Sequence, residues 1–178
     1  MTGSQIIEQL KSVVGHKGVL SSKSKTAYFR SGFRSGFGGA VGVVFPKSLI
    51  ELWKTLKVCV DANCAIIMQA TKTGLTEGSS PSGFDYDREV VIINITRIKK
   101  IILLDDGKQV IAFPGSTLHE LEGQLSSIKR APHSVIGSTT IGATIVGGIA
   151  NNAGGALCKR GSLILNCRCM PESTKKGI

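Results

Sequence analysis

A loop rich in glycine and hydroxyl side chains is the first place in this sequence where chemistry could occur. It runs from Gln69 to Ser79 and directly follows Ala65 to Met68, a short apolar run suited to an interior strand. Parallel sheets bind ligands at such positions. Gly74 and Gly78 permit close approach of the backbone, and successive N–H groups in a tight turn can form a concavity that binds phosphate oxygens. The residues alone fit a phosphate-binding loop and an ordinary surface loop equally well.

A second candidate is the glycine-rich segment from Gly137 to Gly161, in which glycine alternates with threonine, alanine, isoleucine and asparagine. Glycine loses more chain entropy on folding than any other residue. A packing requirement could explain one or two of these glycines. A run this dense favours a backbone that lies against a flat or bulky ligand.

Several enzyme classes are excluded by the motifs that the sequence lacks. There is no G-x-G-x-x-G at the start of a helix, no G-x-x-x-x-G-K-[ST] and no G-x-S-x-G elbow. His16, His119 and His133 are far apart in the sequence, so no catalytic residue can be assigned. Among five cysteines, Cys167 and Cys169 form one CxC without a second pair. We therefore expect free thiols and no metal site.

The charge balance is strongly basic, with 22 Lys and Arg against 12 Asp and Glu and a formal net charge of +10. Such a charge favours a polyanionic partner. The basic residues are scattered, and no nucleic-acid-binding motif accompanies them, so we expect no nucleic-acid partner. Residues 131–158 carry no Asp, Glu, Lys or Arg, but Asn151 and Asn152 would be costly to bury in hydrocarbon. No secretion signal opens the chain, which predicts a cytoplasmic protein.

Periodicity and capping signals indicate the elements that would position these segments. Apolar residues on one face predict a first helix after Ser4, and capping boxes predict further helices after Ser48 and Thr117. Strand, helix and strand in succession form the unit of a parallel sheet. The predicted strands are residues 41–45, 65–68 and 90–93, followed by a hairpin of 100–104 and 109–113, whereas residues 16–39 are predicted to be an irregular connection.

Four segments carry a resemblance to a known family. They are GFRSGFG at 32–38, VVFPKSLIELWKTLKVCV at 43–60, MQATKTGLTEGSSPSGFDYDREVVII at 68–93 and PHSVIGSTTIGATIVGGIANNAGG at 132–155. They resemble the FAD-binding domain of the p-cresol methylhydroxylase (PCMH) type, especially that of the quinone-dependent D-lactate dehydrogenases. The resemblance implies an α+β fold of the PCMH type, whose N-terminal part has a small mixed or parallel sheet covered by helices.

The resemblance also implies where the cofactor binds. In the family the loop after the interior strand wraps the FAD pyrophosphate, and the Gly-rich segment supplies further flavin contacts. Family members commonly carry Asn at the position of Lys72 and Ser at that of Thr144, so main-chain contacts are the ones expected to persist there. No histidine lies between Gln69 and Arg88, so the FAD is expected to be non-covalent. The implied cofactor-binding residues are Ala70, Thr71, Lys72, Thr73, Gly74, Gly78, Ser79, Gly137, Thr144 and Gly154.

The same resemblance implies a domain organisation and a parent reaction. We expect an N-terminal helix and connecting segment at 1–35, an incomplete FAD-binding domain at 36–161, and a tail at 162–178 that departs from the family as an abrupt or out-of-frame ending. The full-length parent would oxidise D-lactate to pyruvate, pass hydride to FAD and electrons to membrane quinone, and sit peripherally on the cytoplasmic face of the inner membrane. Whether this chain itself contacts a membrane is left open.

Two other interpretations stand beside this one. The chain could be a non-enzymatic truncated remnant that binds FAD weakly or not at all. It could also be another flavin enzyme of the same fold, such as a cell-wall precursor reductase, although that family is not expected to share the GLTEGSSPSGFDYDRE stretch at 74–89.

Overall fold

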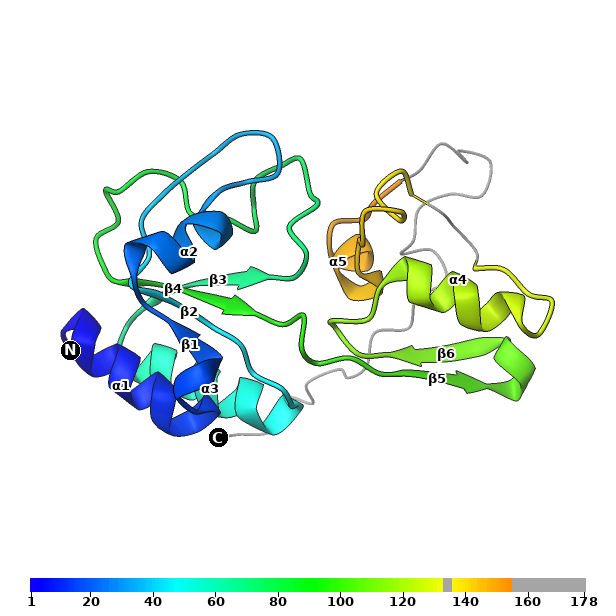
Figure 1. Cartoon of the computed structure of the whole chain (residues 1–178), viewed down its shortest axis with the longest axis horizontal. Helices are drawn as coiled ribbons and strands as arrows, with labels where there is room; N and C mark the ends of the chain where they lie inside the picture. Colours follow the sequence, from blue (N-terminus) through cyan, green and yellow to red (C-terminus); the bar gives the residue numbers. More distant parts are fainter. Residues whose placement is uncertain (133–135, 155–178) are drawn as a thin grey trace, which may run out of the picture.

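The chain forms two lobes that follow one another in the sequence (Figure 1). The computed structural model describes residues 1–132 and 136–154. The first lobe is a four-stranded sheet with helices on both faces, and the second is a two-stranded hairpin with two helices. The predicted α+β class with a small mixed sheet is confirmed.

The described helices and strands have the following bounds. In chain order they are α1 Gly3–Val14, β1 Val19–Leu20, α2 Lys23–Arg30, β2 Gly42–Val44, α3 Leu49–Asp61, β3 Ala65–Gln69, β4 Val90–Asn94, β5 Ile101–Leu104, β6 Gln109–Ala112, α4 Leu118–Ser126 and α5 Ile145–Ala150, with 3-10 turns at His16–Gly18 and Asp105–Gly107.

The first sheet has the strand order β1-β2-β4-β3. Strands β2 and β3 run parallel to β4, and β1 is antiparallel to β2. Strand β4 is buried along its whole length. Its run of Val and Ile without alternation is typical of a strand that is covered on both faces. The order also shows that β2 and β3, which flank α3 in the sequence, are separated in the sheet by β4.

Two hydrophobic clusters cover the two faces of this sheet. On one face, Ile6 and Leu10 of α1 are fully buried with Ile93 of β4, and α3 completes the cluster. On the other face, Ile92 packs with Phe45, whose ring meets that of Phe29 of α2 edge to face at 5.1 Å. The successive residues Ile92 and Ile93 therefore point to opposite faces, as the period of a strand requires.

Two predictions in the N-terminal region were wrong. Helix α1 begins at Gly3, not after Ser4, because Thr2 caps it and forms a reciprocal capping box with Gln5. Residues 16–39 also contain helix α2, which was predicted to be an irregular connection. The hydroxyl of Ser22 accepts a hydrogen bond from the N–H of Lys25 at its start, but this polar helix lacks a sustained apolar period.

The second lobe agrees with its sequence signals. Strands β5 and β6 form the predicted antiparallel hairpin, and Thr117 with Glu120 forms the predicted capping box of α4. A separate cluster that contains Leu118, Leu121 and Ile145 packs α4 and α5 against the hairpin.

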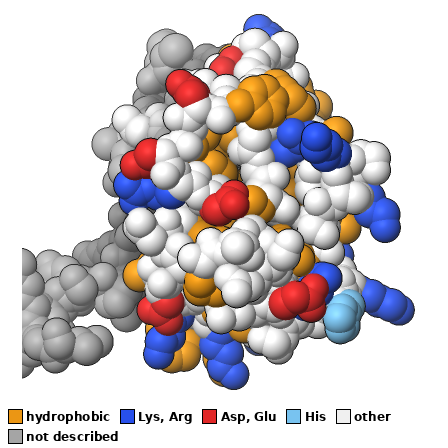
Figure 2. Space-filling view, turned by 90° about the vertical axis from the view of Figure 1, so that its left-hand side faces the viewer, with side chains coloured by type: hydrophobic (Ala, Val, Ile, Leu, Met, Phe, Trp, Pro, Cys, Tyr) orange, Lys and Arg blue, Asp and Glu red, His pale blue; other side chains and the backbone are white. Residues whose placement is uncertain are grey.

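Surface charge on the end of the first lobe is mixed. Figure 2 shows Lys and Arg side chains scattered around the edge of this face, with Asp and Glu side chains between them. Within residues 1–132 and 136–154, the helices include none that is both long and apolar enough to cross a membrane.

Candidate functional site

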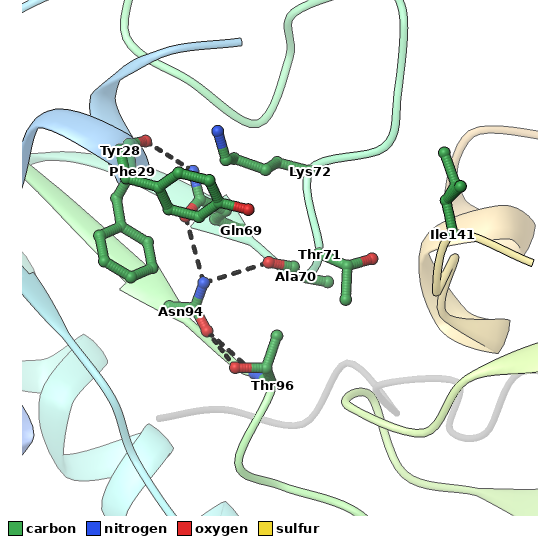
Figure 3. Close-up of a pocket in the computed structure, with 9 residues that line it drawn as sticks. All are labelled: Tyr28, Phe29, Gln69, Ala70, Thr71, Lys72, Asn94, Thr96 and Ile141. Carbon is green, nitrogen blue, oxygen red and sulfur yellow. Dashed lines mark hydrogen bonds between the residues drawn. The ribbon is translucent and has the colours of Figure 1, made fainter. Parts of the chain in front are cut away.

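Two buried amide side chains meet at the carboxyl ends of the neighbouring strands β3 and β4. Gln69 and Asn94 are register partners in the parallel ladder. The Nδ2 of Asn94 donates to Oε1 of Gln69 at 3.1 Å and to the carbonyl oxygen of Ala70 at 3.1 Å (Figure 3). Buried polar groups are stable when they are paired in this way. The pair marks the edge of the sheet where ligands bind in α/β folds.

Gln69 also closes the loop that follows β3. Its Nε2 donates to the carbonyl oxygen of Ser79 at 2.6 Å and to that of Phe29 at 2.8 Å. One side chain at the start of the loop therefore holds the far end of the same loop and the helix α2 beside it. Neither Gln69 nor Asn94 was among the predicted site residues. The signal that could have found them is a polar residue at the end of each apolar run, AIIMQ and VVIIN.

The loop from Ala70 to Ser79 is irregular and leaves its amide groups open. Among the described residues, none of its backbone N–H groups donates a hydrogen bond to another residue. Lys72 and Glu77 have left-handed backbone conformations, with φ of 47° and 60°. A left-handed residue beside a right-handed one can turn neighbouring N–H groups toward a common point, an arrangement that favours anion binding. The loop is non-helical, as predicted, but the prediction of a buried interior strand before it was wrong, because β3 is the edge strand of the sheet and is only partly buried.

A cavity of about 290 Å³ lies beside this loop. It brings the loop together with the segment before α5, because Ile141 contributes to its wall (Figure 3). Of the predicted site residues, it is lined by Ala70, Thr71 and Lys72. Its wall consists of Tyr28, Phe29, Gln69, Ala70, Thr71, Lys72, Asn94, Thr96 and Ile141.

Lys72 is the single charged residue in this wall. Its Nζ donates to the carbonyl oxygen of Ser31 at 3.0 Å and lies 3.8 Å from the centroid of the Tyr28 ring. Burial lowers the pKa of the Lys72 ammonium below its ordinary value.

The described glycines differ in how much space surrounds them. At Gly38 an added Cβ would lie 2.6 Å from the carbonyl oxygen of Gly83, so packing alone requires glycine there. At four predicted site positions, Gly74, Gly78, Gly137 and Gly154, an added Cβ would meet no described atom within 4 Å, and φ is not left-handed. Neither packing against described residues nor backbone conformation explains these four glycines.

Thr144 has a structural role of its own. It is the N-cap of α5, and its hydroxyl accepts a hydrogen bond from the N–H of Gly147 at 3.2 Å. The residue is buried, with 3% of its surface exposed. Its hydroxyl is therefore engaged by its own helix, and a main-chain contact of Thr144 with a cofactor stays a prediction.

The remaining predicted positions are not brought into the cavity wall. Thr73, Gly74, Gly78 and Ser79 continue the loop beyond it, and Gly137, Thr144 and Gly154 lie around α5. Their contacts with a cofactor stay predictions. The end of the Gly-rich segment, residues 155–161, and the predicted tail at 162–178 lie outside the described residues.

Cys59 and Cys64 are free thiols next to the sheet. Burial raises the pKa of the Cys59 thiol to about 12. A thiol with such a pKa is almost entirely protonated near neutral pH and is a poor nucleophile.

The fold and the family match identify a class of FAD-binding domains. The architecture is shared with p-cresol methylhydroxylase in a substrate-bound crystal structure, with a TM-score of 0.66 and 16% identity over 84% of this chain and 29% of that one. An alkyldihydroxyacetonephosphate synthase structure matches with a TM-score of 0.61 and 18% identity over 71% of this chain and 25% of that one. A family model described as an FAD binding domain matches residues 40–171. The chain belongs to this family of FAD-binding domains.

Three bacterial relatives are named quinone-dependent D-lactate dehydrogenases. The protein of Escherichia coli K12 is 55% identical over 87% of this chain and 27% of its own length. The protein of Haemophilus influenzae is 48% identical over 99% of this chain and 31% of its own length. The protein of Corynebacterium glutamicum is 45% identical over 90% of this chain and 28% of its own length. The chain thus spans about three tenths of these relatives. The family match also continues past residue 161, and the predicted domain boundaries stay predictions.

Replacing Gln69 with leucine tests the closure of the loop. The change leaves the partly buried carbonyl oxygens of Ser79 and Phe29 without their donor, which costs up to about 1–3 kcal/mol for each unsatisfied group. We expect a lower free energy of unfolding by urea denaturation and faster proteolysis between residues 70 and 79. Gln124→Leu on the exposed side of α4 is the matched control and should change neither. Wild-type stability and cleavage rate in the Gln69 variant would show that this amide does not hold the loop.

Proposed function

We propose that this chain is the FAD-binding part of a quinone-dependent D-lactate dehydrogenase. The parent reaction is oxidation of D-lactate to pyruvate, with the electrons passed to a quinone. The observation that carries the proposal is the loop at 70–79, whose open amides follow the parallel edge strand β3 in a chain 45 to 55% identical to three proteins of that name. Because the chain spans about three tenths of them, the reaction belongs to the assembled enzyme.

Different segments of this chain would bind different parts of the cofactor. The amides of Ala70 to Gly74 and of Gly78 and Ser79 would donate to the diphosphate oxygens. The glycines at 137 and 154 would let the backbone lie against the flavin side of the molecule, and the main chain at Thr144 would contribute beside them. When bound, FAD supplies the acceptor for the hydride from C2 of D-lactate. The loop between Gln69 and Arg88 holds no histidine, so we propose that FAD is held without a covalent bond.

The proposal also covers the place in the cell where the assembled enzyme works. Quinones reside in membranes, so we propose that the assembled enzyme works peripherally at the cytoplasmic face of the inner membrane. The net charge of +10 suits a surface that carries anionic lipids.

Titration of the purified 178-residue chain with FAD tests the proposal. Charge-assisted hydrogen bonds contribute roughly 1.5–3 kcal/mol each, so a partial set of phosphate contacts predicts a Kd of about 1 μM or weaker. Flavin fluorescence gives the Kd, and a dye-coupled assay measures D-lactate oxidation. We expect binding without turnover above a flavin-only control, since no described residue is assigned as the catalytic base.

The result distinguishes the competing interpretations. An absence of FAD binding at millimolar concentration would contradict the proposal and favour the non-enzymatic remnant. Turnover of D-lactate by the chain alone would show that catalytic groups lie within it.

A further inference from the structure

Helix α3 exposes a strip of large apolar side chains. Ile50 is 67% exposed and Trp53 is 61% exposed. The opposite face of the helix packs on α1 and the sheet, and Cys59 there is fully buried. Helix α3 therefore has two apolar faces, and the described residues cover only one of them. The exposed strip of α3 consists of Leu49, Ile50, Trp53 and Val60, which lie at helical spacing.

Lysine side chains lie among the apolar residues of this strip. Lys54 and Lys57 are exposed on α3, and Lys47 is exposed just before the helix. Within residues 1–132 and 136–154, none of these three lysines takes part in an ion pair. The Nζ of Lys57 lies 6.0 Å from the centroid of the Trp53 ring, so the cation and the aromatic ring share one surface. The charges of the lysines are available to an anionic partner.

The acidic residues of α3 offset little of this positive charge. Glu51 is half-buried, and its carboxylate accepts a hydrogen bond from the backbone N–H of Lys47 at 2.7 Å. Asp61 lies at the C-terminal end of the helix. Figure 1 shows α3 beside α1 on one side of the sheet, with α2 on the other side. The exposed strip of α3 is therefore apolar and basic over most of its length.

This mixture of residues indicates the kind of partner. Lysine is depleted in protein–protein interfaces, whereas apolar residues and tryptophan beside lysine are typical of helices that lie in the surface of an anionic membrane. A tryptophan ring suits the boundary between headgroups and acyl chains, and a lysine can keep its stem on apolar surface while its ammonium reaches the headgroups. The net charge of +10 attracts the whole chain to such a surface.

We propose that the exposed strip of α3 is a membrane-binding surface that docks on anionic phospholipid. Ile50 and Trp53 would enter the boundary between headgroups and acyl chains, and the neighbouring lysines would pair with lipid phosphates. The inference rests on the proposed function for its membrane location, and it assigns that location to a surface of this chain. The FAD-binding part would then touch the membrane itself, whether or not FAD is bound.

Fluorescence of Trp53 tests the proposal directly, because it is the single tryptophan of the chain and reports on α3 alone. The purified 178-residue chain is titrated, without FAD, with vesicles of phosphatidylcholine and with vesicles that also contain phosphatidylglycerol. We expect a blue shift of the Trp53 emission and protection from acrylamide quenching with the anionic vesicles only. High salt should weaken this binding, because it screens the attraction between charges.

The lysines of the strip are tested with a matched loss of charge elsewhere. Loss of two lysines near an anionic surface predicts that Lys54→Gln/Lys57→Gln binds anionic vesicles roughly 10- to 30-fold more weakly. Lys23→Gln/Lys25→Gln is the control, because these lysines are exposed on α2, on the other side of the sheet. The control should bind nearly as the wild type does.

Ile50→Ser tests the apolar contact and keeps Trp53 as the reporter. Removing an apolar side chain that enters the membrane should weaken vesicle binding by roughly 5-fold or more. Circular dichroism and thermal melting establish that each variant is folded, and we expect little change because all of the substituted side chains are exposed.

Several outcomes would overturn the inference. These are equal binding to both kinds of vesicle, equal affinity in the two lysine pairs, and a blue shift that grows with protein concentration without vesicles, which would make the strip an interface between copies of the chain. An FAD titration of the same protein separates the inference from the proposed function. FAD binding without vesicle binding would contradict only the membrane-binding surface, and vesicle binding without FAD binding would contradict only the FAD-binding role.

Discussion

Replacing Gly74 with valine is expected to weaken FAD binding by at least about 100-fold, because two or more charge-assisted hydrogen bonds would be lost at roughly 1.5–3 kcal/mol each. Space around Gly74 is open, and its φ lies outside the left-handed region. A valine there neither collides with described residues nor strains the turn. Its branched side chain would instead occupy the space that a diphosphate needs beside the open amides.

The measurement is a titration of wild type and Gly74→Val with FAD, together with urea denaturation of both. Gly123→Val is the matched control, because Gly123 on α4 also has no described atom within 4 Å of an added Cβ. The Gly74 variant should lose affinity while its free energy of unfolding stays close to that of the wild type. Equal FAD affinity in both glycine variants and the wild type would exclude this loop as the phosphate site.

Replacing Ile93 with alanine is expected to lower the free energy of unfolding by about 2–5 kcal/mol, the range for large-to-small changes in protein cores. Ile93 is fully buried at the centre of the sheet, where α1 and α3 cover it. The loss is large because a whole domain is stable by only about 5–15 kcal/mol. Urea or thermal denaturation, followed by circular dichroism, measures it.

Ile111→Ala is the control for Ile93→Ala. Ile111 lies on β6 in the second lobe and is 49% exposed, so its truncation removes little buried surface. A loss at Ile93 no larger than that at Ile111 would mean that β4 is not the centre of the core.

Local patterns in the sequence were sufficient to predict most of the helices and strands. The uninterrupted run of Val90 to Ile93 predicted a strand covered on both faces, and Asp105 to Gly107 predicted a hairpin turn. The caps at Ser48 and Thr117 marked the starts of α3 and α4. Helix α2 could not be predicted this way, because it lacks a sustained apolar period and its Phe29 packs on Phe45, a contact between distant segments.

Some features of the candidate site also follow from the local sequence, whereas others depend on contacts between distant segments. The position of the loop after β3 could be read from the order of apolar and polar residues. The role of Gln69 could not, because it depends on the register of β3 with β4 and on the fold of the loop back to Ser79. The placement of Lys72 on Tyr28 likewise requires α2 to lie beside the loop.

The order of strands in the first sheet has a consequence for synthesis on the ribosome. Strand β4 lies in the middle of the sheet but is the last of its four strands to be translated. Until it emerges, β2 and β3 have no common partner, and the apolar faces of α1 and α3 have no complete surface to cover. The nascent first lobe therefore stays open through residue 89 and closes around its final strand, with hydrophobic residues accessible to chaperones until then.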